Sequence, residues 1–522
     1  MRKINFNWLL LMLSIFILTA CSESKTSKLL KQVPVSSEYV SLVNAKTLIE
    51  SAGGSMTDSK SILPPAITDM MPSSSKSDLE DINKILSDVG IDSEACVIFG
   101  NYESDSPIIV VSLSDEDKFI KMITEEGYKA ESKADDVAFY TKVTEYGYKT
   151  IAITKSFAYC ALKPAKQSAV SKLKNIITDA ANDSYASTEF GKYISKGNAG
   201  GIALKIPPQT QQQLIAAGAA PSMVTLYKGV VCIYGNLTED AMEINTKLLN
   251  EDGSEKDLAA FKDMFDVNAK INKKALAYMG SNDLLIMAVS LKNVDWDKYM
   301  ETVLQGNALS RSDKATLTIA KSHFEKLDGT VAIGLGITNG LESIFNMDIG
   351  NDFMNQFSMT LVAETKEGKA KGLVNELKAF LEKGNIPYTS TESGLSVELP
   401  DKAGTFYVEN TDDLLVFANH KITNKNDNAT VDGIDFSNYL SACGLVINKD
   451  NKLLKDLNIQ NDIKASITGD ANNIDGSFKM EIKGGEAKGF LAKLIGIVTN
   501  ISNQEKALDR KLREHRKKVY GY

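Results

Sequence analysis

The same order of predicted elements occurs twice along this chain, and this repetition limits the folds that it can adopt more than any other feature. Each part begins with an extended run, passes through a helix, two apolar strands and a second helix, and ends in a meander of strands. The sequence Phe-Gly-Lys-Tyr-Ile-Ser at 190–195 returns as Phe-Ser-Asn-Tyr-Leu-Ser at 436–441. The alternative, chance similarity, is disfavoured by the matching order of many elements. Two copies predict a tandem pair of similar domains, because a solenoid needs about three or more repeats.

Helix signals and apolar patterns place these elements along the sequence. Ser77 and Glu80 form a capping-box pattern, Gly90 is placed to end that helix, and Ser114 and Asp117 give a second start signal. In the first part we expect an extended run at 39–43, a helix over 77–90, strands at 95–100 and 107–113, a helix over 114–127, and a meander at 137–143, 148–155 and 157–162. In the second part we expect an extended run at 275–279, a helix over 317–327, strands at 330–334 and 357–363, a helix over 373–384, and a meander at 395–399, 405–408 and 414–418.

The strand patterns indicate the fold class. Most predicted strands alternate apolar and polar residues, and few are the continuous apolar runs of a buried parallel sheet. We therefore predict an α+β fold, in which each domain is a mostly antiparallel sheet with amphipathic helices packed on one face. The first α+β repeat is expected at 33–255 and the second at 270–502, with the polar stretch 250–257 near the boundary.

The N-terminus has the features of a secretory signal. Arg2 and Lys3 supply positive charge, residues 8–18 form a short apolar run, and Leu-Thr-Ala leads to Cys21. This ending resembles the bacterial lipobox, and the resemblance implies removal of residues 1–20 and attachment of lipid to Cys21. The alternatives are an ordinary signal peptide or a short N-terminal anchor. Residues 21–32 are then expected to form a polar tether between the lipid and the first domain.

Charge and hydropathy exclude some classes of function. Loss of Arg2 and Lys3 with the signal takes the formal net charge from -8 to -10. A secreted acidic chain without a broad basic face is not expected to bind nucleic acid. No apolar run after residue 20 approaches the ~20 residues of a membrane-spanning helix, so the lipid is the expected link to the membrane.

Residues that could carry catalysis are scattered. His323, His420 and His515 lack the spacing of a zinc site. Ser73 and Lys76 fit a Ser-x-x-Lys pattern but lack the companion motifs of that class of nucleophile. We therefore expect no catalytic residue and no metal site.

Two loops and the cysteines give no stronger signal. The glycines at 334–340 follow a strand as a dinucleotide loop would, but the corresponding place in the first part has no glycine cluster, so no cofactor is expected. The asparagines at 424–428 resemble a calcium loop in spacing, yet neutral amides and Ala429 at the turn position disfavour binding. An oxidising compartment would permit disulfides, but buried free thiols are favoured for the four dispersed cysteines: Cys96, Cys160, Cys232 and Cys443.

The C-terminal segment 503–522 is basic and amphipathic. Leu508, Leu512, His515 and Val519 share one helical stripe. Such a helix can lie on anionic lipid or dock on a partner, and the alternative is a solvated helix that packs its short stripe back on the protein. The candidate contact residues are Arg510, Arg513, Arg516 and Lys517.

Together the lipobox, the length, the opening Val-Pro-Val-Ser-Ser-Glu-Tyr-Val at 33–40 and the two-part layout resemble large uncharacterised lipoproteins of Bacteroidetes, which are catalogued as a domain of unknown function. The resemblance implies a lipid-anchored protein of the cell envelope and brings no catalytic residues. Ser22 after the lipidated cysteine resembles lipoproteins sent to the outer membrane. The sparse acids that follow favour its periplasmic face over the cell surface.

Three functional hypotheses follow. The first is a non-catalytic outer-membrane lipoprotein that acts as an envelope scaffold or binds a protein partner. The second is surface capture of a glycan or another nutrient, although the mature chain has a single tryptophan, Trp296, to serve as a sugar platform. The third is an envelope hydrolase whose catalytic groups come from distant parts of the chain.

Overall fold

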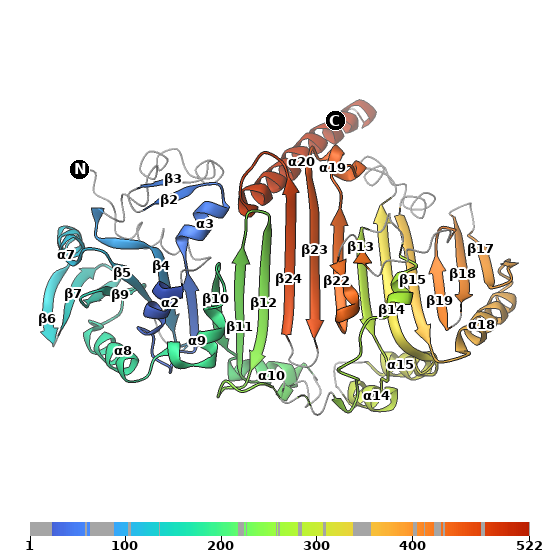
Figure 1. The fold of residues 1–522 in the computed structure, drawn as a ribbon, viewed down its shortest axis with the longest axis horizontal. Helices are drawn as coiled ribbons and strands as arrows, with labels where there is room; N and C mark the ends of the chain where they lie inside the picture. Colours follow the sequence, from blue (N-terminus) through green and yellow to red (C-terminus); the bar gives the residue numbers. More distant parts are fainter. Residues whose placement is uncertain are drawn as a thin grey trace. The chain divides into compact units, whose positions relative to one another are not determined.

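A computed structural model describes residues 23–57, 60–62, 88–102, 106–134, 136–217, 224–225, 227–256, 258, 262–279, 284–305, 310–337, 357–399, 404–411, 413–421, 430–431, 434–470 and 475–520. The chain divides into two compact units. Figure 1 labels their helices and strands. Unit 1 comprises Met1–Pro208, Lys228–Glu255 and Glu486–Thr499, and unit 2 comprises Gln209–Tyr227, Lys256–Gly485 and Asn500–Tyr522.

Unit 1 is built on an antiparallel sheet in the order β6-β7-β8-β9-β5-β4-β1-β10-β11-β12. Its strands are β1 (Tyr39–Val43), β4 (Ile91–Gly100), β5 (Ile108–Leu113), β6 (Lys129–Ala134), β7 (Val137–Thr144), β8 (Gly147–Ile153), β9 (Phe157–Ala161), β10 (Gly200–Lys205), β11 (Val230–Leu237) and β12 (Ala241–Leu249), with a separate hairpin of β2 (Ser55–Thr57) and β3 (Lys60–Ile62). Its helices are α2 (Glu23–Leu30), α3 (Ala45–Ser51), α7 (Glu116–Glu125), α8 (Val170–Asn182), η1 (Tyr185–Ser187) and α9 (Glu189–Ile194).

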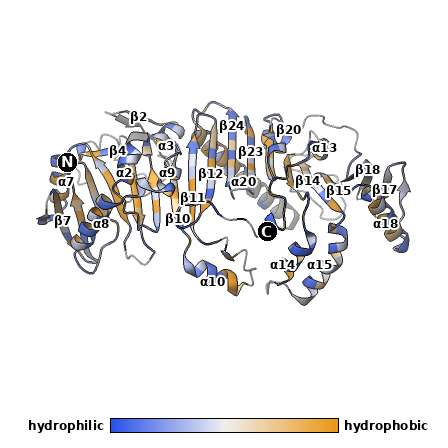
Figure 2. Cartoon of the chain, turned by 60° about the horizontal axis from the view of Figure 1, so that its bottom comes forward, coloured by the Kyte–Doolittle hydropathy of each residue, from blue (hydrophilic) through white to orange (hydrophobic). Residues whose placement is uncertain are grey.

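Helices cover both faces of the unit 1 sheet, whereas we predicted helices on one face. Along β4, Cys96 and Ile98 join a core with α3 and α7, and Val97 and Phe99 join a second core with α2, α8 and α9. The residues from Ile108 to Val111 in β5 are all buried for the same reason. Figure 2 shows strong hydrophobic colouring on the strands from β4 to β10.

Unit 2 is also an antiparallel sheet with helices, in the order β16-β17-β18-β19-β15-β14-β13-β22-β23-β24. Its strands are β13 (Leu285–Ser290), β14 (Leu327–Ile337), β15 (Phe357–Thr365), β16 (Thr389–Ser390), β17 (Gly394–Glu398), β18 (Thr405–Thr411), β19 (Leu414–Ala418), β22 (Ser441–Ile447), β23 (Asn461–Asp470) and β24 (Asp475–Gly484), with a small hairpin of β20 (Thr430–Val431) and β21 (Ile434–Asp435). Its helices are α13 (Lys273–Leu276), α14 (Trp296–Gln305), α15 (Arg311–Phe324), α18 (Lys369–Lys383), η3 (Phe436–Asn438) and α19 (Lys452–Asp456). Two further helices, α10 (Pro208–Ala216) and α20 (Phe490–Tyr520), contain residues of both units.

A polar cluster fixes the start of the unit 2 core. The Glu364 carboxylate accepts hydrogen bonds from the Asn272 side chain (2.7 Å) and from the backbone N–H of Thr330 (2.8 Å). Asn272 in turn caps α13, because its side-chain oxygen accepts from the Lys274 N–H at 3.0 Å. Gly329 has φ +137° and lies next to this cluster, at the point where the pairing of β14 with β15 is irregular.

Two of the element predictions need correction. The run 275–279 is not extended: Asn272 starts helix α13 there, and the strand that pairs with β14 is β13, at Leu285–Ser290. Helix α7 begins one residue later than the Ser114 pattern suggests, because Asp115 is its N-cap and accepts from the Lys118 N–H at 3.1 Å. Most of the helix predicted over 77–90 lies outside the described residues.

The predicted tether is part of the unit 1 core. Thr26, Leu29, Leu30 and Val33 are at most 1% exposed, and the three apolar residues of this set pack with Val97 and the rest of the second core. The Tyr159 hydroxyl donates to the Gln32 side chain at 2.7 Å. Residues 23–32 are therefore folded structure and not a flexible spacer.

The predicted C-terminal segment 503–522 is the later part of a longer helix. Helix α20 runs without interruption from Phe490 to Tyr520, and the division between the two units falls within it, after Thr499. Phe490 and Ile497 are buried at its start, in the part that belongs to unit 1. Neither glycine nor proline interrupts the chain between Ile497 and Tyr520, so nothing in the sequence ends the helix at 503.

Candidate functional site

The turn between β7 and β8 carries large hydrophobic side chains in solvent. Val143 and Tyr146 are 71% and 78% exposed, the highest fractions among the large hydrophobic residues described, and Tyr148 is 36% exposed. Val143 and Tyr148 lie opposite each other in the strand register. We call Val143, Tyr146 and Tyr148 the hairpin tip. Exposed tyrosines of this kind are enriched in protein interfaces, because the ring offers apolar area and the hydroxyl a polar end.

Local hydrogen bonds hold the hairpin tip in one shape. The Thr144 hydroxyl accepts from the Tyr146 N–H at 3.3 Å and donates to the Gly147 carbonyl at 2.8 Å. The backbones of Tyr148 and Ala165 exchange two bonds of 2.8 Å each. Gly147 has φ +125°, and a Cβ there would lie 2.3 Å from the Ala165 oxygen, so only glycine fits. A surface fixed in advance loses less entropy when it binds.

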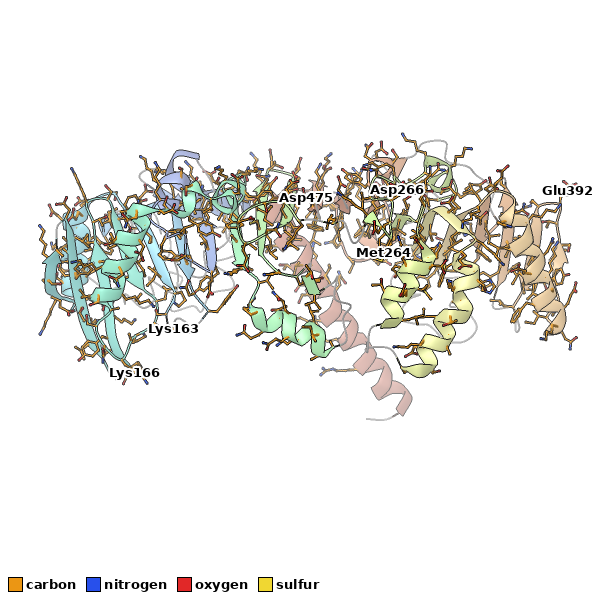
Figure 3. The ribbon with its side chains drawn as sticks, turned by 90° about the horizontal axis from the view of Figure 1, so that it is seen from below. Lys163, Lys166, Met264, Asp266, Glu392 and Asp475 are labelled. Atoms are coloured by element: carbon orange, nitrogen blue, oxygen red, sulfur yellow. The ribbon has the colours of Figure 1, made fainter. Side chains whose placement is uncertain are left out.

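The loop that holds the tip and the strands beneath it are polar. Figure 3 labels Lys163 and Lys166, on either side of Ala165. Lys142 pairs with Glu126 at 3.7 Å and lies 5.7 Å from the centre of the Tyr128 ring. A hydrogen bond to Glu145 raises the pKa of the Tyr146 hydroxyl, which therefore stays neutral at physiological pH. The tip has the pattern of a small interface, with an apolar centre inside a polar rim.

Unit 2 also exposes apolar residues on its sheet. Met287, Cys443 and Ile467 form one row across β13, β22 and β23, and Met287 and Ile467 are 39% and 56% exposed. No described hydrogen bond or turn gathers further exposed apolar groups around this row. This row is therefore a weaker candidate for a contact surface than the hairpin tip.

The basic residues predicted for partner or membrane contact lie on α20. Arg510 and Arg513 are exposed, and the Arg510 Nε donates to the Lys506 carbonyl at 3.3 Å. Arg516 and Lys517 lie in the same helix, with side chains outside the described set. None of the described helices has both the length and the apolar character to cross a membrane.

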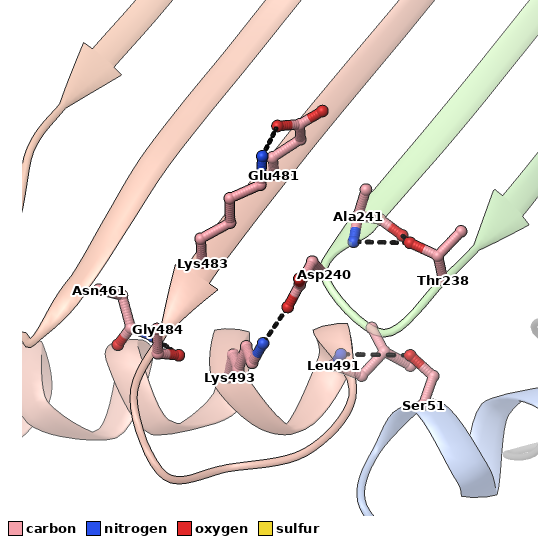
Figure 4. Close-up of polar contacts among 10 residues, drawn as sticks. All are labelled: Ser51, Thr238, Asp240, Ala241, Asn461, Glu481, Lys483, Gly484, Leu491 and Lys493. Carbon is pink, nitrogen blue, oxygen red and sulfur yellow. Dashed lines mark hydrogen bonds and ion pairs between the residues drawn. The ribbon is translucent and has the colours of Figure 1, made fainter.

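The first turns of α20 are fixed to unit 1 (Figure 4). Lys493 is 7% exposed and pairs with Asp240 in the turn between β11 and β12. The Leu491 N–H donates to the Ser51 hydroxyl at 3.3 Å. A nearly buried lysine needs such a partner, because burial of an unpaired charge is costly.

The described part of the chain brings no catalytic set together. His323 is an exposed partner of Glu376 at 3.9 Å, and His420 lies beside Asn419. Within the described ranges, no three residues of His, Cys, Asp or Glu are placed to hold a metal ion. Cys21, Ser73 and the asparagines at 424–428 lie outside the described residues.

The four internal cysteines are free thiols. Burial raises the pKa of Cys96, Cys160 and Cys232 to about 12 each, so these thiols stay protonated at neutral pH and are poor nucleophiles. Cys443 is intermediate in exposure, and burial raises its pKa as well.

Sequence reasoning missed the hairpin tip. It placed strands on both sides of the turn and singled out neither of the two tyrosines. The available signal was the apolar and aromatic pattern Val-Thr-Glu-Tyr-Gly-Tyr at 143–148, where a two-residue turn would normally be polar.

Comparisons with known proteins add little. No family model matches the chain, and no curated protein matches its sequence. A crystal structure of TP0453 (crystal form I) aligns over 75% of this chain and 91% of its own, with 10% identity and a TM-score of 0.20. A TM-score this low carries no argument about fold or function.

Proposed function

We propose that this protein is a non-catalytic lipoprotein of the cell envelope that binds a protein partner through the hairpin tip of unit 1. The observation that carries the proposal is the exposure of Val143 and Tyr146 on a turn with fixed geometry. Apolar side chains that gather on the surface inside a polar rim mark a contact site for a partner. The lipid on Cys21 would hold the protein at the membrane, on the periplasmic face of the outer membrane.

We also infer that the two units are duplicated domains. Each strand in the order of unit 1 has a counterpart at the same place in the order of unit 2, from β6 and β16 at one edge to β12 and β24 at the other. Phe190 and Phe436, the first residues of the matching sequence pattern, are both buried before the equivalent strands β10 and β22. The corresponding turn of unit 2, between β17 and β18, lies partly outside the described residues, so the proposed contact rests on unit 1 alone.

Photo-crosslinking in intact cells of the parent organism tests the partner. A photoreactive amino acid replaces Tyr146 in one variant and the exposed Lys174, on α8, in the control. We expect one dominant envelope protein crosslinked from position 146 and a yield at least about tenfold lower from position 174, since contact hot spots are few and local. Equal yields from both positions, or only abundant bystanders from position 146, would contradict the proposal.

A further inference from the structure

Helix α2 leaves almost no free chain between the folded domain and Cys21. The helix begins at Glu23, and Thr26, which is fully buried, lies within its first turn. Only Cys21 and Ser22 precede the helix in the processed chain. An extended residue spans at most about 3.6 Å, so these two residues reach about 7 Å.

We propose, on the basis of the lipid anchor proposed above, that unit 1 rests directly against the membrane surface, with one defined end of its sheet facing the lipid headgroups. The polar layer of a bilayer leaflet is about 5–8 Å thick, because the hydrocarbon core accounts for ~30 Å of a total of ~40–45 Å. A two-residue connection therefore places the first turn of α2 at headgroup level. A protein partner far from the membrane could not be reached by swinging unit 1 on a tether.

Contacts of α2 identify the end of the sheet that faces the lipid. Lys25 lies 2.9 Å from Asp92 and 2.8 Å from Glu94, both in the first half of β4. The start of β4 pairs with the end of β5, since Ile91 lies opposite Leu113. The Leu113 N–H donates at 2.8 Å to the carbonyl of Ser156 in the turn between β8 and β9. We call this end, marked by Ile91, Leu113 and Ser156, the proximal end.

The hairpin tip lies at the opposite, distal end of the same sheet. Strand β8 runs from Gly147 beside the tip to Ile153 just before the proximal turn. The six steps from Gly147 to Ile153, at ~3.3 Å each, separate the two ends by about 20 Å. The anchor and the tip therefore have distinct roles: the proximal end meets lipid, and the distal end points away from the headgroups.

Charge does not hold the proximal end to the membrane. Lys118 and Lys155 are exposed there, but Asp115, Glu116 and Asp117 carry the opposite sign at the same end. Lys25 is already paired with two carboxylates. We therefore expect the arrangement to persist at high salt, which would release a surface held by basic residues alone.

Fluorescence quenching by lipid tests the orientation. The lipidated full chain with Cys443→Ser is placed in vesicles of phosphatidylethanolamine and phosphatidylglycerol with headgroup-quencher lipids. One variant carries a fluorophore at Ser156→Cys and another at Tyr146→Cys. The three buried thiols, with pKa values of about 12, will not compete for the label. We expect strong quenching at position 156, little at position 146, and the same ratio in 0.5 M salt, where screening lengths fall to about 4 Å.

A spacer provides the matched control. Insertion of about twelve Gly and Ser residues between Ser22 and Glu23 adds an average reach of about 20 Å. We expect the quenching at position 156 to fall several-fold while the vesicles retain the protein. Equal quenching at 146 and 156, or no response to the spacer, overturns the inference. If the protein fails to float with the vesicles, the proposed lipid anchor is overturned, and the inference about orientation falls with it.

Discussion

Replacing Leu29 with alanine is expected to destabilise unit 1 by about 2–5 kcal/mol, the usual cost of removing a fully buried leucine side chain. Leu29 is 0% exposed and packs in the core shared with Val97 and Leu173. The alanine leaves a cavity between α2 and the sheet. Urea unfolding of the chain without lipid gives the free energy, and hydrogen exchange of peptides from β4 and β5 shows that the loss lies in unit 1.

The matched control for this prediction is Lys28→Ala, one residue earlier in the same helix. Lys28 is exposed, so its replacement is expected to change the free energy of unfolding by less than about 0.5 kcal/mol. If Leu29→Ala were as harmless as Lys28→Ala, residues 23–32 would be a tether after all, and the argument for close membrane contact would fail.

The second large effect is expected for Gly329→Ala in unit 2, with a loss of about 2–4 kcal/mol from backbone strain and overpacking. Gly329 has φ +137°, which side chains rarely adopt, and a Cβ there would lie 2.1 Å from a carboxylate oxygen of Glu364. Movement of Glu364 would break its bonds to Asn272 and Thr330. Faster hydrogen exchange is expected in peptides from β14 and β15.

Gly372→Ala is the control, because it makes the same chemical change in the same unit. Gly372 lies in the exposed part of α18, and no atom lies within 4 Å of the place that an alanine Cβ would take. Alanine should stabilise this helix by about 0.5–1 kcal/mol. Loss of stability in both variants, or in neither, would contradict the assigned role of the Glu364 cluster.

The antiparallel strands could be predicted because their signals are local. The meander strand Val137–Thr144 is rich in β-branched and aromatic residues, and Leu414–Ala418 is a short apolar run between turns. The coverage of both sheet faces was not predicted. The buried run Ile108–Val111 indicates a strand with both faces covered, and its significance depends on helices far away in the sequence.

The wrong predictions of secondary structure concern short segments. The run Ala-Leu-Ala-Tyr-Met at 275–279 is too short for a period of two and a period of 3.6 to be distinguished, and the cap at Asn272 decides for a helix. Helix α2 contains only two large apolar residues, Leu29 and Leu30, among lysines and serines. Helix α2 is buried by residues that lie far away in the sequence, so no local pattern predicts its burial. The hairpin tip was missed because its local signal is a single aromatic residue, Tyr146, in a two-residue turn, and the exposure of that residue is visible only in the folded structure.

The most direct test of the lipid anchor compares Cys21→Ser with Cys443→Ser in cells of the parent organism. Each variant loses one sulfur, but only Cys21 is the proposed lipid site. We expect that Cys21→Ser leaves the membrane fraction and no longer incorporates labelled palmitate. Cys443→Ser should stay membrane-bound and labelled, with Cys21 as its N-terminal residue. Membrane retention and palmitate labelling of Cys21→Ser equal to those of Cys443→Ser would contradict it.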